Sequence, residues 1–208
     1  MDVKLDNIGR RFNREWIFEG IDYTFKTGSS YAILGHNGSG KSTLLQVIAG
    51  SLSPSSGTIA YLQGDKTIDM DTVYQSVAVA APYLELIEEF SLRELLDFHF
   101  RFKRPLNQLT TKQIIALLGL EKSASKPLKY FSSGMKQRTK LALALCSDTS
   151  LTLLDEPASN LDLAGIAWYK DMVAQFGGDR TLIVCSNQDF EYDFCSHQLQ
   201  LTDYKKIQ

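Results

Sequence analysis

A glycine-rich segment carries the first residues that could do chemistry. The sequence from Gly35 to Thr43 reads Gly-His-Asn-Gly-Ser-Gly-Lys-Ser-Thr and fits the phosphate-loop pattern. In such a loop, consecutive backbone N–H groups surround a triphosphate, the lysine reaches the outer phosphates and the next hydroxyl holds Mg²⁺. A chance glycine-rich turn is the alternative, but a predicted strand before the segment and a helix after it favour the phosphate loop. The predicted nucleotide-binding residues are Gly35, Asn37, Gly38, Ser39, Gly40, Lys41, Ser42 and Thr43.

A pair of acids follows the short apolar segment Leu151-Thr-Leu-Leu and precedes Pro157. Acids at the end of such a strand are typical of the magnesium shell of a phosphate-loop protein, so Asp155 and Ser42 are the predicted metal ligands. Glu156 would then lie beside the terminal phosphate, where a carboxylate kept ionised by Mg²⁺ can accept a proton from the attacking water. The alternative for Asp155 is a cap at the end of the strand. The pair favours hydrolysis of ATP.

A third segment, Phe131-Ser-Ser-Gly-Met-Lys-Gln-Arg138, places Ser-x-Gly at the start of a predicted helix. A serine and a glycine at a helix N-terminus form a second anion-binding device. Taken together, the three segments resemble the nucleotide-binding domain of ATP-binding-cassette (ABC) transporters. The resemblance extends from about Leu5 to about Ile207, which is almost the whole chain.

The resemblance implies a dimer of two such domains that pack head to tail. In that family, the signature serine and glycine of one chain bind the γ-phosphate of ATP held on the phosphate loop of the other. A further loop with Ser159 and Asp162 is implied to lie across the dimer interface, although Asp162 also fits a helix cap and both roles are compatible. The implied signature residues are Ser132, Ser133, Gly134 and Met135.

An aromatic side chain is implied to stack on the adenine of ATP. Phe12 lies nine residues before Ile21, at the position where the family has this aromatic residue, and Trp16 is the nearby competitor. An aromatic face fits the base without reading its edge. The alternative for Phe12 is an aromatic residue at the edge of a small strand core.

Two positions depart from the family pattern. The glutamine that usually touches Mg²⁺ and transmits to the membrane partner is replaced in the stretch Val79-Ala-Ala-Pro82-Tyr83, and Pro82 cannot ligate a metal. The usual histidine near the γ-phosphate is replaced by Asn187, which can donate an amide hydrogen bond but carries no charge. Asn187 is therefore a candidate catalytic residue beside Glu156, and hydrolysis is expected to be slow or to need a complete partner chain.

Alternating strands and helices must position these residues. They predict an α/β fold with a phosphate-loop NTPase core, a mainly parallel sheet, an antiparallel β subdomain in the first 26 residues and an α-helical signature subdomain. One domain, 1–208, is expected, with a β edge and phosphate-loop core (1–82), a helical part with the signature (83–147) and the rest of the core (148–208). The predicted strands cover 31–34, 58–62, 66–68, 77–80, 151–154 and 181–185. The predicted helices cover 41–49, a segment capped by Ser91, a segment from Thr110 or Thr111 to Leu118, 134–146 and about 163–176.

Composition excludes several classes of protein. The 22 basic and 24 acidic residues give a net charge of −2, which offers no broad attraction for nucleic acid. No apolar run approaches the roughly 20 residues that span a bilayer, and the start lacks a signal-peptide core. Three cysteines fit reduced thiols better than a disulfide framework. A cytoplasmic protein is expected, held at the inner face of the membrane by a partner.

These features predict the ATP-binding and hydrolysing subunit of an ABC membrane transporter, with ATP and Mg²⁺ as cofactors. The expected partners are a transmembrane subunit, reached near Tyr83, Leu84, Leu86 and Ile87, and a second ATP-binding subunit in a homo- or heterodimer. The same four side chains could instead belong to the core of the helical part. The form of the signature favours an exporter. The alternatives are a weakly hydrolysing, ATP-dependent dimerisation module or degenerate half of a heterodimer, and a soluble ABC ATPase of translation or DNA repair.

Overall fold

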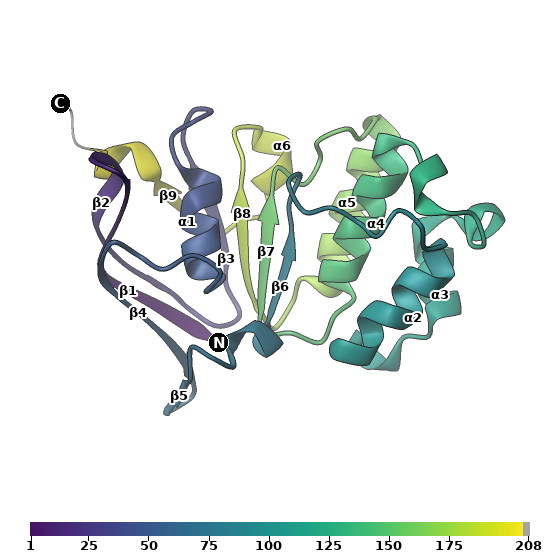
Figure 1. Cartoon of the computed structure of the whole chain (residues 1–208), viewed down its shortest axis with the longest axis horizontal. Helices are drawn as coiled ribbons and strands as arrows, with labels where there is room; N and C mark the ends of the chain where they lie inside the picture. The colour runs from purple at the N-terminus through teal and green to yellow at the C-terminus, as the bar shows by residue number, and fades with distance from the viewer. Residues whose placement is uncertain (206–208) are drawn as a thin grey trace.

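The computed structural model describes residues 1–205 and contains two sheets and a helical region (Figure 1). One sheet is antiparallel with strand order β2-β1-β4-β5, and the other is parallel with order β6-β7-β8-β3-β9. The antiparallel strands are β1 (Asp2–Phe12), β2 (Glu15–Phe25), β4 (Ser56–Gln63) and β5 (Lys66–Ile68). The parallel strands are β3 (Ser30–Leu34), β6 (Val77–Ala80), β7 (Leu151–Asp155), β8 (Thr181–Cys185) and β9 (His197–Gln200).

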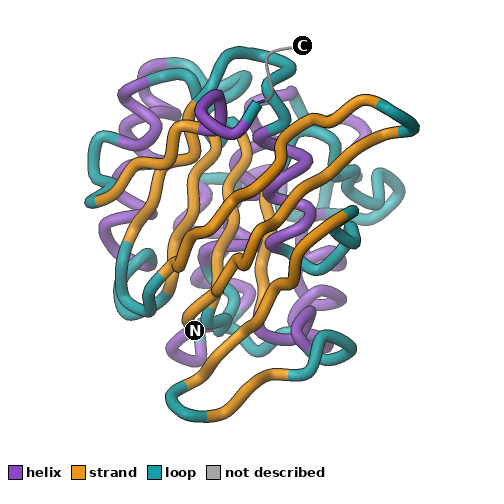
Figure 2. Tube along the Cα trace, turned by 90° about the vertical axis from the view of Figure 1, so that its left-hand side faces the viewer, coloured by secondary structure: helices purple, strands orange, loops and turns teal. Residues whose placement is uncertain are grey.

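Helices cover the parallel sheet on both faces, as its apolar strands require. Helix α1 lies between the two sheets, and Figure 2 shows the antiparallel sheet as a separate layer in front of the helices and the other sheet. The remaining long helices form the opposite layer. The helices are α1 (Lys41–Ile48), α2 (Leu92–Phe102), α3 (Thr111–Leu118), α4 (Ser133–Leu145), α5 (Leu163–Phe176) and the short α6 (Asp189–Tyr192).

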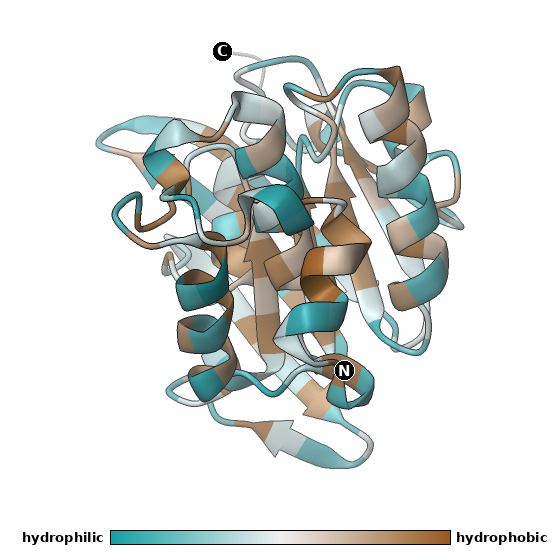
Figure 3. Cartoon of the chain, turned by 90° about the vertical axis from the view of Figure 1, so that its right-hand side faces the viewer, coloured by the Kyte–Doolittle hydropathy of each residue, from teal (hydrophilic) through white to brown (hydrophobic). Residues whose placement is uncertain are grey.

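Two buried clusters hold these layers together. One cluster joins the two sheets around α1, and the other joins the parallel sheet to helices α2 to α5. Figure 3 shows the same division, with hydrophobic colour on the inner strands and hydrophilic colour on the outward faces of the helices. Strands β3, β7 and β8 have five residues each, and all of these residues are buried except Ser30, which is half-buried. These three strands therefore form the centre of the sheet.

The order of these central strands brings distant segments together. Strand β8 pairs with β7 on one side and with β3 on the other, and all three run in the same direction. The carboxyl ends of parallel strands meet at one edge of the sheet, where ligands bind in open α/β folds. The segments that follow β3, β7 and β8 are therefore neighbours, and they contain the phosphate loop, Glu156 and Asn187.

Local signals define the helix boundaries. Ser91 and Glu94 form a reciprocal capping box at the start of α2, and Thr110 and Gln113 do the same for α3. Gly119 ends α3 in the left-handed conformation with φ +66°. The predicted α/β architecture is confirmed, while α6 and β9 are elements that the sequence did not indicate.

Candidate functional site

The phosphate loop forms a cavity of about 240 Å³ between β3 and α1. Lys41 is the first residue of α1, so the loop ends at a helix N-terminus, where partial positive charge favours an anion. The segment after β7 closes the same cavity from the other side. The lining residues are Ile17, Asn37, Gly38, Gly40, Lys41, Ser42, Thr43 and Glu156.

Two glycines of the loop are required for different reasons. Gly38 has φ +78°, and a Cβ atom there would meet no protein atom within 4 Å, so a side chain would enter the open space of the cavity. Gly40 has φ +104°, and a Cβ atom there would lie 2.3 Å from Cγ2 of Ile17. The steric demand at Gly40 therefore comes from strand β2, a contact that the sequence pattern did not reveal.

The ammonium group of Lys41 lies inside the loop. Its Nζ donates hydrogen bonds to the carbonyl oxygens of Gly35 at 2.7 Å and His36 at 3.3 Å, and the residue is only 5% exposed. Neutral carbonyl oxygens do not offset a positive charge, so a lysine held by them can attract an incoming anion. The structure thus supplies a buried cation on the floor of the cavity that Gly38 leaves open.

Asp155 ends β7 below the loop and is 2% exposed. Burial raises the pKa of its carboxyl, a hydrogen bond with Ser42 opposes the rise, and the nearby Glu156 adds to it. The Oδ1 atom is buried and has no hydrogen-bond partner among residues 1–205. A buried carboxylate oxygen without a partner, next to a serine hydroxyl, fits a hard divalent cation such as Mg²⁺, which takes one or two protein ligands and completes its shell with water and phosphate.

Glu156 has an unusual backbone. Its φ is +44°, a left-handed conformation that costs a non-glycine residue about 1 kcal/mol or more. Its N–H donates to the carbonyl oxygen of Cys185 at 2.9 Å, and its carbonyl oxygen accepts the N–H of Ser159 at 3.0 Å. This turn directs the chain so that Glu156 lines the phosphate-loop cavity.

Asn187 lies directly after the neighbouring strand β8. Its Nδ2 donates to Oδ1 of Asn37 on the phosphate loop at 2.6 Å. The structure therefore brings together four of the predicted groups, namely the phosphate loop, Asp155, Glu156 and Asn187. It also shows that Asn187 already has a partner on the loop.

The signature segment lines a second, separate hollow of about 350 Å³. Ser132 caps α4 by accepting the N–H of Met135 at 3.2 Å, and Asp162 caps α5 by accepting the N–H of Gly165 at 2.7 Å. The Oγ of Ser159 is buried without a hydrogen-bond partner in the described part of the chain. The lining residues are Ser132, Ser133, Gly134, Met135, Arg138, Asn160, Leu161 and Asp162, and none of them lines the phosphate-loop cavity.

Comparison with known proteins decides the family. The family model described as "ABC transporter" matches residues 18–159, which include all three motifs. The chain belongs to the ABC transporter family.

Curated relatives of this ABC chain include importers and exporters. The chain is 33% identical over 164 residues to the spermidine/putrescine import ATP-binding protein PotA of Fusobacterium nucleatum, covering 77% of this chain and 43% of that protein. It is 32% identical over 163 residues to the Nod factor export ATP-binding protein I of Burkholderia lata, covering 77% and 54%. The chain thus spans about half the length of these two relatives.

Solved ABC structures share the fold at low sequence identity. A putative ABC transporter ATP-binding protein from Pyrococcus furiosus superposes with a TM-score of 0.83 at 20% identity, over 99% of this chain and 100% of that one. The dimeric bacterial ABC transporter cassette MJ0796 gives a TM-score of 0.77 at 20% identity, over 96% and 94%. The fold class predicted from the sequence is confirmed by these likenesses. An ABC ATP-binding chain of this kind is an ATPase.

The predicted adenine-stacking residue of this ABC chain lies apart from the phosphate-loop cavity. Phe12 ends β1, is 46% exposed and is not among the residues that line the cavity. The guanidinium of Arg10 lies 4.6 Å from its ring centroid. Its competitor Trp16 faces Gly9, where a Cβ atom would lie 2.9 Å from the Trp16 ring. Phe12 remains the predicted adenine contact, with one ring face occupied by Arg10.

The segment from Val79 to Tyr83, where the family usually has a glutamine, brings Tyr83 to the site. Nζ of Lys140 donates to the carbonyl oxygens of Ala81 at 3.3 Å and Pro82 at 2.9 Å, which holds the segment against α4. Burial and the nearby Asp155 carboxylate raise the pKa of Tyr83 to about 12, and Gln46 shares a hydrogen bond with its hydroxyl. Tyr83 is thus a polar neighbour of the predicted metal carboxylate that the family pattern did not indicate.

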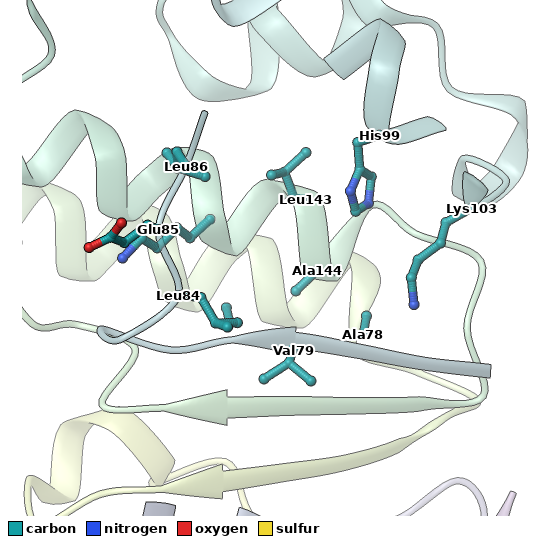
Figure 4. Close-up of a pocket in the computed structure, with 11 residues that line it drawn as sticks. Ala78, Val79, Leu84, Glu85, Leu86, His99, Lys103, Leu143 and Ala144 are labelled. Atoms are coloured by element: carbon teal, nitrogen blue, oxygen red, sulfur yellow. The ribbon is translucent and has the colours of Figure 1, made fainter. Parts of the chain in front are cut away.

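The same segment borders a cavity of about 250 Å³ against the helical region (Figure 4). Figure 4 shows Leu84, Glu85 and Leu86 on one side and Leu143 of α4 on the other, with His99 and Lys103 at one end. Burial lowers the pKa of His99 to about 4, so this imidazole is neutral at pH 7. Of the four predicted contacts for a membrane partner, Leu86 packs against the helical core, while Tyr83, Leu84 and Ile87 are about two-fifths exposed.

No helix within residues 1–205 combines the length and apolar character needed to cross a bilayer. The same residues hold no group of three His, Cys, Asp or Glu side chains arranged for a metal ion.

Proposed function

We propose that this chain binds ATP with Mg²⁺ on its phosphate loop, hydrolyses it in a dimer and thereby drives a membrane exporter. One observation carries the catalytic part of this proposal. Lys41, Ser42 and Glu156 line one cavity, and the partnerless oxygen of Asp155 lies beside it. A cation, a metal position and a general base converge on the space where phosphates would lie.

Each residue has a role that follows from its position. Lys41 would bind the outer phosphates, and the N–H groups from Asn37 to Thr43 would surround the remaining oxygens. Ser42 and Asp155 would hold Mg²⁺, which supplies charge neutralisation of the phosphate oxygens. Glu156 would accept the proton of the attacking water. Asn187 would turn its Nδ2 from Asn37 toward the γ-phosphate and stabilise the charge that develops there.

A second copy of an ATP-binding chain would complete the site. In one chain the signature hollow and the phosphate-loop cavity share no lining residue, which supports a contact of Ser132 and Gly134 with ATP held by another copy. The partnerless Oγ of Ser159, next to that hollow, supports an interface at this surface. The likeness to a dimeric ABC cassette agrees with this arrangement. The second chain is either identical or a different subunit.

A transmembrane subunit would receive the movement. Tyr83 and Leu84 border cavities next to the segment after β6. Together with the exposed side chain of Ile87 they offer an apolar contact. Through that subunit, the chain would sit at the cytoplasmic face of the membrane.

The direction of transport is proposed to be export. The signature Ser-x-Gly-Met-Lys-Gln-Arg favours it, and one relative of this chain is a Nod factor export protein. We treat 1–208 as one ABC ATPase domain with the parts 1–82, 83–147 and 148–208, of which 206–208 lie outside the described residues.

Steady-state ATP hydrolysis by the purified chain with Mg²⁺ tests the proposal. Wild type should turn over, and Glu156→Gln should lower kcat by about 10² to 10⁴-fold while ATP still binds, because removal of a general base costs that much. Glu121→Gln, at an exposed acid between α3 and the signature, is the matched control and should behave as wild type. Turnover that survives Glu156→Gln would rule out this carboxylate as the base.

A second candidate function is an ATP-dependent dimerisation switch that hydrolyses little. The hydrogen bond from Asn187 to Asn37 supports it, because an amide occupied by the loop contributes less to the γ-phosphate. Asn187→His separates the two functions. A wild type that binds ATP without turnover, together with turnover in Asn187→His, favours the switch, whereas turnover in wild type shows that the amide suffices.

A further inference from the structure

The proposed chemistry leaves one buried carboxylate unused. Glu191 lies on α6, is 3% exposed, and faces the two segments that carry Glu156 and Asn187. Its Oε1 accepts the backbone N–H of Ala158 at 2.6 Å, and its Oε2 accepts the hydroxyl of Ser186. Ala158 is two residues after Glu156, and Ser186 directly precedes Asn187. One side chain thus joins the segments after β7 and β8.

A carboxylate at this place costs free energy. Burial raises the pKa of Glu191, while the hydrogen bonds from Ser186 and Ala158 oppose the rise. None of the ion pairs within residues 1–205 includes it. An apolar side chain of the same length would avoid this cost and often serves stability as well or better than a buried charge. Stability alone therefore gives a weak reason for an acid here.

The geometry of Glu156 gives a stronger reason. Its left-handed backbone persists only where the surroundings fix it. On one side, Nε2 of the buried Gln137 on α4 donates to the carbonyl oxygen of Pro157 at 2.8 Å. On the other side, Glu191 accepts the next N–H, that of Ala158. The two residues that follow Glu156 are therefore held from both sides.

We propose that Glu191 is a positioning residue that holds the turn bearing Glu156 and keeps it in register with the turn bearing Asn187. The proposal rests on the proposed role of Glu156 as general base. Two hydrogen-bond acceptors on one rigid carboxylate set the separation of the two turns. Loss of these acceptors lets the strained turn relax, and a misplacement of about 1 Å at a reacting group costs roughly 10²-fold in rate.

Glu191→Met removes both acceptors while it keeps the length of the side chain. We expect kcat to fall roughly 10- to 100-fold with KM within about 2-fold of wild type, because the nucleotide is held by the phosphate loop and only the base is displaced. Glu191→Gln should keep kcat within about 3-fold, because its amide can accept from Ala158 and donate to the Ser186 oxygen. The melting temperature of each variant is measured in parallel.

Thr181→Val is the matched control. Thr181 is fully buried at the opposite end of β8, and its hydroxyl donates to the carbonyl oxygen of Met1 at 2.6 Å. Its loss removes one buried hydrogen bond far from the turns, so it should lower the melting temperature and leave kcat unchanged. A Glu191→Met variant with wild-type kcat overturns the proposal. So does a loss of kcat that Thr181→Val reproduces at the same change in melting temperature.

Hydrogen exchange separates this proposal from the proposed function. The amide of Ala158 should exchange faster in Glu191→Met than in wild type or Thr181→Val, with no nucleotide present. If wild type fails to hydrolyse ATP, the proposed function fails, and exchange at Ala158 still decides whether Glu191 holds the turn. Unchanged exchange in Glu191→Met overturns the positioning role whatever the turnover.

Discussion

The phosphate-loop cavity and the signature hollow are built in opposite ways. At the phosphate loop, Lys41 and Asp155 are almost fully buried, and their partners are other residues of the same loop and strand edge. At the signature, Ser132 and Ser133 are exposed, and the hollow is shaped by two helix N-terminal caps. The first region is organised by its own chain. The second is a surface with exposed polar groups, and in the proposed dimer it would act on ATP held by a partner chain.

This difference has an energetic basis. A buried cation, a partnerless carboxylate oxygen and a left-handed glutamate are each costly, and the central strands β3, β7 and β8 supply the rigid frame that tolerates them. At the signature hollow the charged and hydroxyl side chains are less buried, and Ser132 and Asp162 also cap helices. Substitutions in the phosphate loop should therefore weaken ATP binding. Substitutions at the signature should lower ATP turnover and leave ATP binding unchanged.

The largest effect on the affinity for ATP should come from Lys41→Ala. Removal of the buried Lys41 ammonium would take away the charge-assisted hydrogen bonds proposed to the phosphates, and the affinity for ATP should fall by about 10² to 10³-fold, as for other buried charged partners. Equilibrium binding of a fluorescent ATP analogue to the isolated chain measures this. An affinity within a few-fold of wild type would show that the cavity is not organised around Lys41.

Complementation between two inactive variants tests the second region. Gly134→Asp adds a negative charge to the first turn of α4, where the helix N-terminus favours it, and the new Cβ atom would lie 3.1 Å from the carbonyl oxygen of Asn160. The charge would repel the γ-phosphate of a partner chain. Each of Lys41→Ala and Gly134→Asp alone should lack turnover. An equal mixture should recover about a quarter of wild-type activity, since half of the dimers are mixed and each holds one complete site of two.

The mixing experiment has two informative controls. Gly134→Asp alone should bind ATP as well as wild type does, because the signature hollow shares no lining residue with the phosphate-loop cavity. A chain that carries both substitutions should rescue neither single variant. No recovery in the mixture of single variants would contradict a head-to-tail dimer of this chain with itself.

Much of the fold could be predicted from the sequence because its signals are local. The capping box of Ser91, the stop at Gly119 and the buried run from Thr181 to Cys185 define elements that the structure reproduces. Strand β9 could not be predicted in this way. His197–Gln200 is polar at three of four positions, and it becomes a strand only because β3 offers it a free edge. A long-range pairing of this kind leaves little trace in the segment itself.

The candidate site divides in the same manner. The motif residues from Gly35 to Thr43 and the acid pair could be predicted from spacing. Ile17, which forces glycine at position 40, and Tyr83, which lies near Asp155, could not, because both contacts join segments that only the folded chain brings together. Glu191 was missed for the same reason. Its partners Ala158 and Ser186 follow two different strands, and no local pattern marks the carboxylate that joins them.

The free-energy cost of burying a carboxylate near the phosphate loop can be measured by substituting Asp155. Burial raises the pKa of this carboxyl in the folded chain, so the stability that its protonated form gives is present at low pH and is lost as the pH rises through the raised pKa. Asp155→Asn removes this loss of stability, because an amide does not ionise. Without nucleotide it should raise the melting temperature at pH 7 by about 3 °C, which is roughly 1 kcal/mol for a domain of this size.

The gain in melting temperature of Asp155→Asn should depend on pH. The gain in Asp155→Asn should shrink as the pH is lowered through the raised pKa of Asp155, because the wild-type carboxyl then becomes protonated as well. Added Mg²⁺ and ATP should stabilise wild type more than the variant, because an amide is a poor ligand for a hard cation. Thermal unfolding at several pH values checks both points. A variant less stable than wild type at pH 7 would mean that Asp155 is satisfied by the protein alone.

The smallest effect should distinguish the two roles of Asp162. Asparagine caps a helix about as well as aspartate, so Asp162→Asn should keep the bond to the N–H of Gly165 and leave the melting temperature unchanged. Asp162→Ala should lose the cap and about 1 kcal/mol of stability. If Asp162 also contacts a partner chain, the removal of its charge should lower turnover a few-fold in both variants, to an extent that does not follow their stabilities. Turnover that falls only in Asp162→Ala would instead make the residue a cap and nothing more, and the polar groups around the signature hollow would then need another explanation than an interface.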